Sequence, residues 1–158
     1  QKIKARKRTN NKWFETQDSI SYWDDFNKQK IVWIELSDEA KFALCDDLIP
    51  LNTVFFMTGT RIIPILAMLN AKIILWYFTH CLGTTSGVGT NRWLKYKIEQ
   101  LPLPQKGLES LNQIMASFIQ RRKMKQNTES LEQDIDNNVC TLYDLSAQEI
   151  EWLNKTMK

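Results

Sequence analysis

Glycine, proline and cysteine are all scarce in this chain of 158 residues. With only 5 glycines and 4 prolines, the chain is neither collagen-like nor a flexible linker protein. The 3 cysteines, Cys45, Cys81 and Cys140, are odd in number and form no CxxC pair, so they predict neither a zinc clamp nor a secreted disulfide framework. We therefore expect a protein of a reducing compartment, the cytoplasm.

Long hydrophobic runs are missing as well. The most apolar region, residues 62–82, falls short of the ~20 uninterrupted residues that span a bilayer, because four residues break it: Pro64, Asn70, Lys72 and His80. The basic residues 1–12 are followed by Trp13-Phe14-Glu15 and not by the apolar stretch of a signal peptide. The sequence predicts no membrane span and no membrane partner.

Residues that carry catalysis are also few. The one histidine, His80, is adjacent to Cys81, and neighbours on a helix point about 100° apart, so they cannot face each other as base and nucleophile. The glycine-rich residues 83–91 contain no lysine that would reach a phosphate. In Asp24-Asp25 and Asp46-Asp47, neighbouring side chains of an extended segment face opposite ways, which disfavours a shared metal ion. The sequence therefore predicts no catalytic residue, metal site or cofactor in this chain.

What the chain does contain is an ordinary supply of core residues. Hydrophobic residues make up 43% of it and charged residues 25%, enough for one buried core without disulfides or a structural metal. Short β-like segments come first, at residues 30–34, 41–45 and 52–56. Apolar residues then recur every three or four positions over residues 62–77, which predicts one helix, buried on more than one side and capped by Thr60.

After this helix the pattern indicates a loop over residues 83–91 and a further strand over residues 93–101. Leu101-Pro102-Leu103-Pro104 then marks a boundary, because proline continues neither a helix nor a strand ladder. Helical stripes follow over residues 108–119 and from Thr128, and Ser146 with Glu149 forms a capping box for a last helix. We predict an α+β protein, with a β region and buried helix in residues 1–105 and a helical extension packed on it in residues 106–158.

The charges are sorted into blocks along the chain. Residues 1–12 hold six bases and no acid, residues 121–125 hold four bases, and residues 129–151 hold seven acids and no base. Segregated sign suits a surface that binds a polyanion, because phosphate contacts gain free energy from Coulomb attraction and counterion release. Solvated helix faces produce the same pattern.

Residues 83–97 hold the strongest candidate binding segment. Small hydroxyl and amide side chains approach a DNA groove closely, and arginine bonds guanine at two atoms. The alternative is a surface loop that only connects a helix to an edge strand. The predicted contacts to base edges are Thr84, Thr85, Ser86, Asn91 and Arg92, and those to phosphates are Lys12, Lys95 and Lys97.

The order of short motifs resembles one known family, the TaqI-like C-terminal specificity domain. Such domains end many single-chain bacterial restriction–modification enzymes of type IIG (Eco57I-like) and related adenine-specific DNA methyltransferases. The resemblance covers about residues 10–153, with Phe14 where the family usually has tyrosine and Ala71 where it has serine. The motifs that carry it are Lys12-Trp13-Phe14-Glu15, Lys30-Ile31-Val32-Trp33, Leu66 to Lys72, Arg92-Trp93, Ile98 to Pro104, and the tail from Ile135 to Ile150.

The resemblance implies a target recognition domain, with a twisted, mainly antiparallel β region flanked by helices that reads double-stranded DNA. A methyltransferase or nuclease module would precede it in the same chain, and Gln1 in place of methionine agrees with such a fragment. S-adenosylmethionine and Mg²⁺ are expected for the parent enzyme and not for this fragment. The motif residues are then scaffold, and the predicted core includes Trp13, Trp33, Leu69 and Trp93.

Two alternatives remain at this point. The helices after Pro104 form a docking module of a multi-subunit restriction system if their stripe of Leu111, Ile114, Phe118 and Ile119 is exposed. The second alternative is a small-molecule enzyme with dispersed carboxylates such as Glu15 and Asp18.

Overall fold

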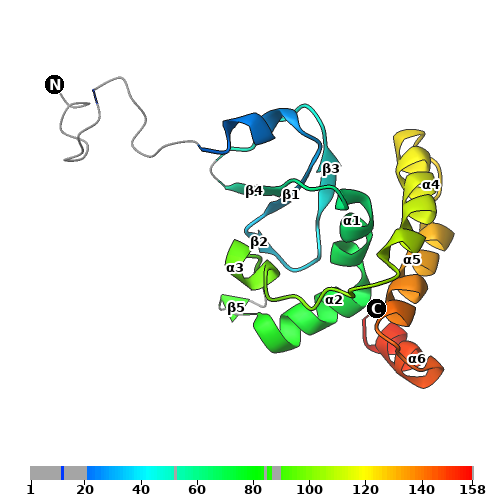
Figure 1. Ribbon diagram of the computed structural model, residues 1–158. Coiled ribbons are helices and arrows are strands. Elements are labelled where there is room, and N and C mark those ends of the chain that lie inside the picture. Colours follow the sequence, from blue (N-terminus) through cyan, green and yellow to red (C-terminus); the bar gives the residue numbers. More distant parts are fainter. Residues whose placement is uncertain (1–11, 13–20, 52, 84, 87–89, 158) are drawn as a thin grey trace.

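Two small sheets lie on one side of the molecule and the longest helices on the other (Figure 1). The computed structural model describes residues 12, 21–51, 53–83, 85–86 and 90–157. Helices and antiparallel strands are both present, so the predicted α+β class is confirmed.

The first sheet consists of β1 (Lys30–Ile34), β3 (Ala43–Cys45) and β4 (Val54–Met57), in the order β3-β1-β4 with antiparallel pairing. β1 carries the alternation of a strand with one covered face, because Ile31 and Trp33 are buried while Ile34 is exposed. The short 3-10 helix η1 (Trp23–Asn27) places Phe26 against Phe56 of β4, with ring centroids 5.3 Å apart. The three strands predicted from the sequence are present, although β3 and β4 each begin two residues later than predicted.

A second sheet is built from β2 (Leu36–Ser37), β6 (Thr90–Arg92) and β5 (Thr85–Ser86), in the order β2-β6-β5. Leu36 pairs with Arg92 and Ser37 with Asn91, and the first pair is exposed while the second is buried. The sequence predicted a loop over residues 83–91, and this was wrong where β5 and β6 lie. The strands form because β2, more than fifty residues away in the sequence, supplies an edge for pairing.

The predicted helix over residues 62–77 is broken at Ala71, whose ψ of 145° is extended. α1 (Ile62–Asn70) and α2 (Lys72–Tyr77), which continues into the π-helix η2 (Phe78–Leu82), form two axes bent by 62°. α1 begins after Arg61 without a side-chain cap, so the predicted cap by Thr60 is also wrong.

Two side chains from other parts of the fold stabilise the break. The amide of Asn70 closes around Phe42, accepting from its N–H at 3.1 Å and donating to its carbonyl at 3.0 Å. The Asp136 carboxylate accepts from the backbone N–H of Lys72 at 2.9 Å, which satisfies an open donor at the start of α2. Burial raises the pKa of Asp136 above its ordinary value, against the opposing pull of Lys72. The break is therefore a product of tertiary contacts.

The bent pair also bears on membrane insertion. No single helix among the described residues is long and apolar enough to cross a membrane, and only α1 together with Lys72–Leu82 reaches that length and composition. Burial accounts for the apolar character of α1, since its Ile62, Leu66, Ala67, Met68 and Leu69 all lie in the core.

Residues 93–101, predicted as a strand, contain the short helix α3 (Lys95–Ile98) instead. The buried residues of this segment are Trp93, Lys97, Ile98 and Leu101. Their spacing of four, one and three matches one face of a helix and not the alternation of a strand. The expectation failed because it took Arg92 to Lys97 as alternating charged and apolar positions.

The C-terminal part follows the sequence prediction closely. The 3-10 helix η3 (Leu108–Ser110) leads into α4 (Leu111–Lys123), and α5 (Glu129–Leu142) begins directly after Thr128, as predicted. α6 (Ala147–Thr156) starts at the predicted capping box, in which the Glu149 N–H donates to the Ser146 hydroxyl and the Glu149 carboxylate accepts from the Ser146 N–H at 2.8 Å.

The capping box gives a pH prediction. The hydrogen bonds from Ser146 lower the pKa of Glu149, so its contribution to the start of α6 is present above pH 4.5 and lost as the pH falls through the lowered value. We expect hydrogen exchange of the first α6 amides to accelerate as the pH falls from 4.5 through the lowered pKa of Glu149. The variant Glu149→Gln keeps the capping geometry without a titrating group, so its exchange protection should be flat over the same pH range once the intrinsic exchange rate is divided out.

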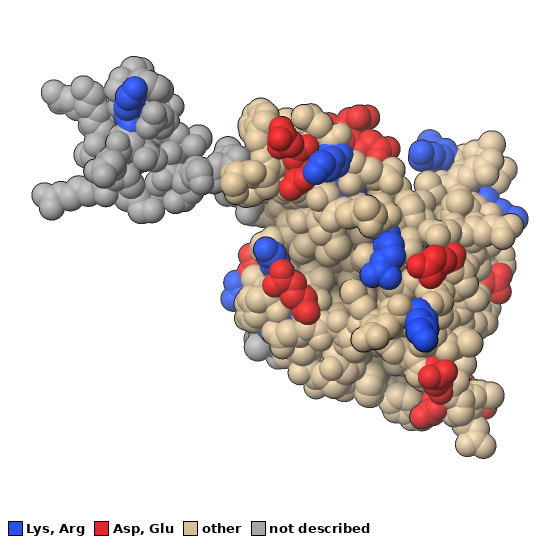
Figure 2. Space-filling model, in the orientation of Figure 1, with Lys and Arg blue, Asp and Glu red and all other residues tan. Residues whose placement is uncertain are grey.

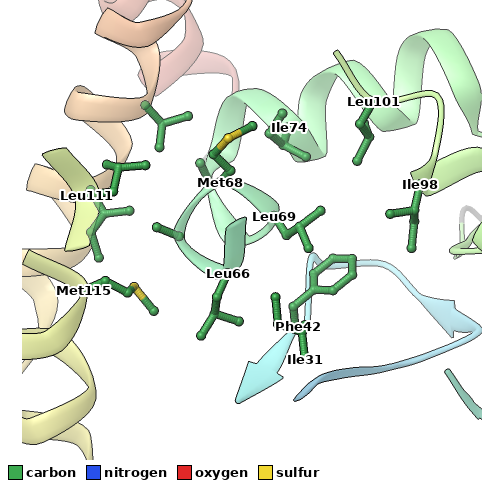
Figure 3. Close-up of a cluster of buried hydrophobic side chains, with 14 of the residues drawn as sticks. Ile31, Phe42, Leu66, Met68, Leu69, Ile74, Ile98, Leu101, Leu111 and Met115 are labelled. Carbon is green, nitrogen blue, oxygen red and sulfur yellow. The ribbon is translucent and has the colours of Figure 1, made fainter. Parts of the chain in front are cut away.

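One core joins the β region to the C-terminal helices (Figure 3). Ile31 from the first sheet, Phe42 just before β3, Leu66 and Leu69 from α1, and Leu111 from α4 belong to the same buried cluster. Trp33, Leu69 and Trp93 are buried as predicted, whereas Trp13 lies outside the described residues.

The stripe on α4 packs against this same core. Leu111 is fully buried, and Ile114, Phe118 and Ile119 are partly buried against the cluster. The free stripe that a docking module requires is therefore absent from α4.

Candidate nucleic-acid interface

The hairpin of β5 and β6 leaves the end of η2 and lies at the edge of the molecule beside α3 (Figure 1). Trp93, the residue after β6, fixes its base. Its backbone N–H donates to the Glu35 carbonyl at 2.7 Å, and its indole Nε1 donates to the Ser37 carbonyl at 3.1 Å. The indole also stacks on Phe78 with ring centroids 3.9 Å apart. One buried side chain thus joins β2, β6 and η2.

A second tryptophan completes this attachment. The Trp33 Nε1 donates to the Trp93 carbonyl at 2.8 Å, so the two indoles bond the backbone at Trp93 and at Ser37, two residues after Glu35. Both donors and both acceptors are buried, where hydrogen bonds are costly to leave unmade. The backbone of Glu35 and of the end of β6 is therefore held rigidly at the surface.

The start of the hairpin is held through Gly83. Its N–H donates to the Phe78 carbonyl at 2.5 Å, which ends η2. A Cβ at this position would lie 2.8 Å from Asn91 Oδ1 and 2.9 Å from the Thr79 carbonyl, closer than real Cβ contacts. Only glycine allows η2 and β6 to approach each other this closely.

Arg92 is the predicted base-contact residue that the structure shows to be exposed. Its side chain is 47% exposed, and its Nε donates to Glu35 Oε1 at 3.0 Å, with a second bond from Nη2 to the same oxygen. The predicted phosphate contact Lys95 is also exposed and lies 3.7 Å from Glu99. These two side chains lie beside the hairpin at its surface.

Asn91 and Lys97, which were also predicted as DNA contacts, do not lie at the surface. Asn91 is 2% exposed, with its Nδ2 donating to the Thr79 hydroxyl at 2.9 Å. Lys97 is 5% exposed, and its ammonium donates to the Leu82 carbonyl at 2.7 Å. β6 turns Asn91 inward, and the helical turn of α3 turns Lys97 inward. A cation at the last carbonyls of a helix is favourable, so Lys97 supports the end of η2.

The other predicted contacts are only partly described. Lys12 is exposed. Thr85 and Ser86 pair with Asn91 and Thr90 through their backbones, and Thr84 lies outside the described residues.

Replacing Lys97 by methionine keeps most of the side-chain volume and removes the ammonium. Because the partly buried Leu82 carbonyl loses its donor, we expect a loss of about 1–3 kcal/mol in the free energy of unfolding. Urea denaturation measures this loss. The control Lys95→Met changes an exposed lysine of the same helix and should stay within about 0.5 kcal/mol. Equal losses for both variants would contradict the structural role of Lys97.

Two of the charge blocks of the sequence, the end of α4 and α5, lie side by side in the fold. Lys and Arg lie beside Asp and Glu on the face shown in Figure 2. Arg122 of the basic end of α4 bonds Glu132 of the acidic α5 at 3.0 Å, and Lys72 lies 3.7 Å from Asp136. The basic end of α4 and the acidic α5 therefore lie next to each other.

Other chemistry is sparse among the residues that the structure describes. They contain no group of three or more His, Cys, Asp or Glu that could hold a metal ion. The His80 ring lies with Nδ1 2.8 Å from the Trp76 carbonyl, which accepts a hydrogen bond when Nδ1 is protonated, and it stacks on the Trp76 ring. A groove of about 720 Å³ lies between the residues around β3 and α4 and α5, where Phe42 and Met115 line it. Glu15 and Asp18 lie outside the described residues.

Comparison with protein families identifies the family of this chain. The model of the TaqI-like C-terminal specificity domain matches residues 1–103, which include both sheets, the hairpin and α3. The helices from η3 onward lie outside the matched residues. No curated protein matches the chain.

Proposed function

Because the chain belongs to the TaqI-like C-terminal specificity domain family, we propose that it selects the DNA sequence on which a restriction–modification enzyme acts. Target recognition is the activity of this family of specificity domains. We further propose that the chain presents the duplex for adenine methylation, and for cleavage, by modules that precede it in the same polypeptide. The family match over residues 1–103 is the observation that carries the proposal.

The hairpin is the part of the chain that best suits a DNA groove. The major groove of B-DNA admits a two-stranded β-ribbon, and β5 with β6 is such a ribbon. We propose that Arg92 contacts a base and that Lys95 and Lys12 contact phosphates, since all three are exposed. Thr84, Thr85 and Ser86 belong to the same proposed contact segment by their position in the sequence.

The parent enzyme defines the remaining partners. We propose a type IIG, Eco57I-like enzyme or a related adenine methyltransferase, in which S-adenosylmethionine and Mg²⁺ belong to the catalytic modules. Such an enzyme acts in the bacterial cytoplasm, where its DNA is. This chain supplies selectivity and no catalytic group.

Binding to duplex DNA at two salt concentrations tests the proposal. The chain is incubated with a pool of duplexes whose central positions are randomised, and retained duplexes are sequenced. We expect enrichment of one short sequence, together with a non-selective component that weakens as salt rises. Retention that is equal for all sequences at both salt concentrations would contradict a role in target recognition.

A further inference from the structure

We infer that Glu35 positions Arg92 to read a guanine, so that the recognised sequence contains a G·C pair whose recognition depends on both residues. This inference rests on the proposed function, and it names a base and a positioning residue that the family does not. Glu35 lies between β1 and β2, a place where the sequence pattern pointed to no function.

The contact uses one edge of the guanidinium and leaves the other open. Arg92 Nε and Nη2 both donate to Glu35 Oε1. Arginine has five N–H donors in a planar fork, so the edge formed by Nη1 and the second Nη2 hydrogen stays available. That edge is the one that bonds O6 and N7 of guanine together, the commonest specific arginine contact in the major groove. Among the described residues, Glu35 is the one acceptor that bonds this guanidinium.

The carboxylate that holds Arg92 is itself held. The Glu35 carbonyl accepts from the Trp93 N–H, and the adjacent Leu36 pairs with Arg92 across the sheet. Trp93 is almost fully buried, and its indole and carbonyl are bonded to Ser37 and Trp33. A site on such rigid elements loses little freedom when its ligand binds, which raises affinity and selectivity.

The exposure of the pair argues for a role beyond stability. The Arg92 and Glu35 side chains are 47% and 32% exposed, and ion pairs this exposed contribute little to the free energy of folding. A carboxylate that fixes the arginine rotamer before binding has a larger effect, because the long side chain no longer has to be ordered by the DNA.

The test begins with the sequence selected from randomised duplexes by the full chain and by its variants. Arg92→Ala should lose preference at one guanine position by about 10- to 100-fold and keep it elsewhere. Glu35→Gln should lose about threefold to tenfold at that same position. The double variant should lose no more than Arg92→Ala, because Glu35 acts through Arg92.

A modified base separates positioning from a general effect on the fold. When 7-deazaguanine replaces that guanine, the wild-type chain should lose affinity because N7 is gone, whereas Arg92→Ala should lose nothing further. Lys95→Ala is the matched control on the same surface. It should keep the guanine preference and reduce the slope of binding against salt by about one. Unchanged thermal midpoints for Arg92→Ala and Glu35→Gln exclude a folding defect.

The outcomes are distinguishable. This inference is overturned if the selected sequence contains no guanine whose preference is lost in Arg92→Ala. It is also overturned if Glu35→Gln leaves the guanine preference unchanged. Target recognition stands in both cases. Retention of all duplexes alike, or of none, overturns the proposed function and the inference with it.

Discussion

Replacing Trp93 by alanine should cost about 3–5 kcal/mol in the free energy of unfolding. The indole is 1% exposed and stacks on Phe78. It also packs edge to face with Phe42, with ring centroids 5.3 Å apart, and donates to the Ser37 carbonyl. Its removal leaves a cavity between η2 and the first sheet and a buried carbonyl without a donor. Because domains of this size have only about 5–15 kcal/mol of stability, urea denaturation should show a much lower midpoint.

Two other variants make this result interpretable. Trp152 is 54% exposed and contacts Trp76 edge to face at 5.8 Å, so Trp152→Ala should cost about 1 kcal/mol or less. Trp93→Phe keeps an aromatic ring on Phe78 but loses the indole donor and part of the ring volume, so its cost should fall between the two. If Trp93→Ala were no more costly than Trp152→Ala, Trp93 would not be the attachment point of the hairpin.

Gly83→Ala should be the next most harmful change, at about 1–3 kcal/mol, as expected for overpacking. Its Cβ would meet two backbone carbonyls of η2, those of Phe78 and Thr79, besides the side chain of Asn91. The carbonyls cannot move without opening the helix end, so the strain falls on the hairpin. Hydrogen exchange should rise at Thr90 and Asn91, and selectivity for a DNA sequence should fall with it.

Gly59 offers a matched control, because a Cβ built there meets no atom within 4 Å. Gly59→Ala should therefore cause no loss, and it should gain up to about 1 kcal/mol by restricting the unfolded chain. Equal effects of the two substitutions would contradict the close packing of η2 against β6. Comparing them separates the space around Gly83 from the general consequences of replacing a glycine.

Local sequence patterns predicted those elements whose contacts are local. The capping box at Ser146 and the start of α5 after Thr128 depend on residues within one turn, and both are confirmed. β1 was also recognised, because its β-branched and aromatic residues favour a strand locally. The break at Ala71 was missed, because it depends on Asp136, which is 64 residues away in the sequence.

The candidate site shows the same division. Arg92 was recognised by its residue type and is exposed, whereas Asn91 and Lys97 were chosen by type and are buried. Their burial follows from pairing with β2 and from the helical form of α3, neither of which the local pattern indicated. Glu35 was missed entirely, because an acidic residue at the end of an apolar segment has no special meaning until its cross-strand partner is known.

The basic residues 121–125 and the acidic residues 129–151 show why the order of charges along a sequence does not by itself give their arrangement in space. Side chains of opposite charge on two neighbouring helices form ion pairs with each other, which leaves them less available to bind a polyanion. Arg122 and Glu132 illustrate this, since they lie 10 residues apart in the sequence on helices that pack side by side.

The alternation along β6 restricts how this family member can change. Arg92 faces outward and Asn91 inward, so a register shift of one residue would bury a guanidinium and leave an amide in water. We therefore expect selection to remove insertions or deletions of an odd number of residues before Arg92, unless a β-bulge restores the inward and outward alternation of the strand. Evolution toward new target sequences should proceed by replacing outward side chains, or by lengthening the hairpin tip in steps of two.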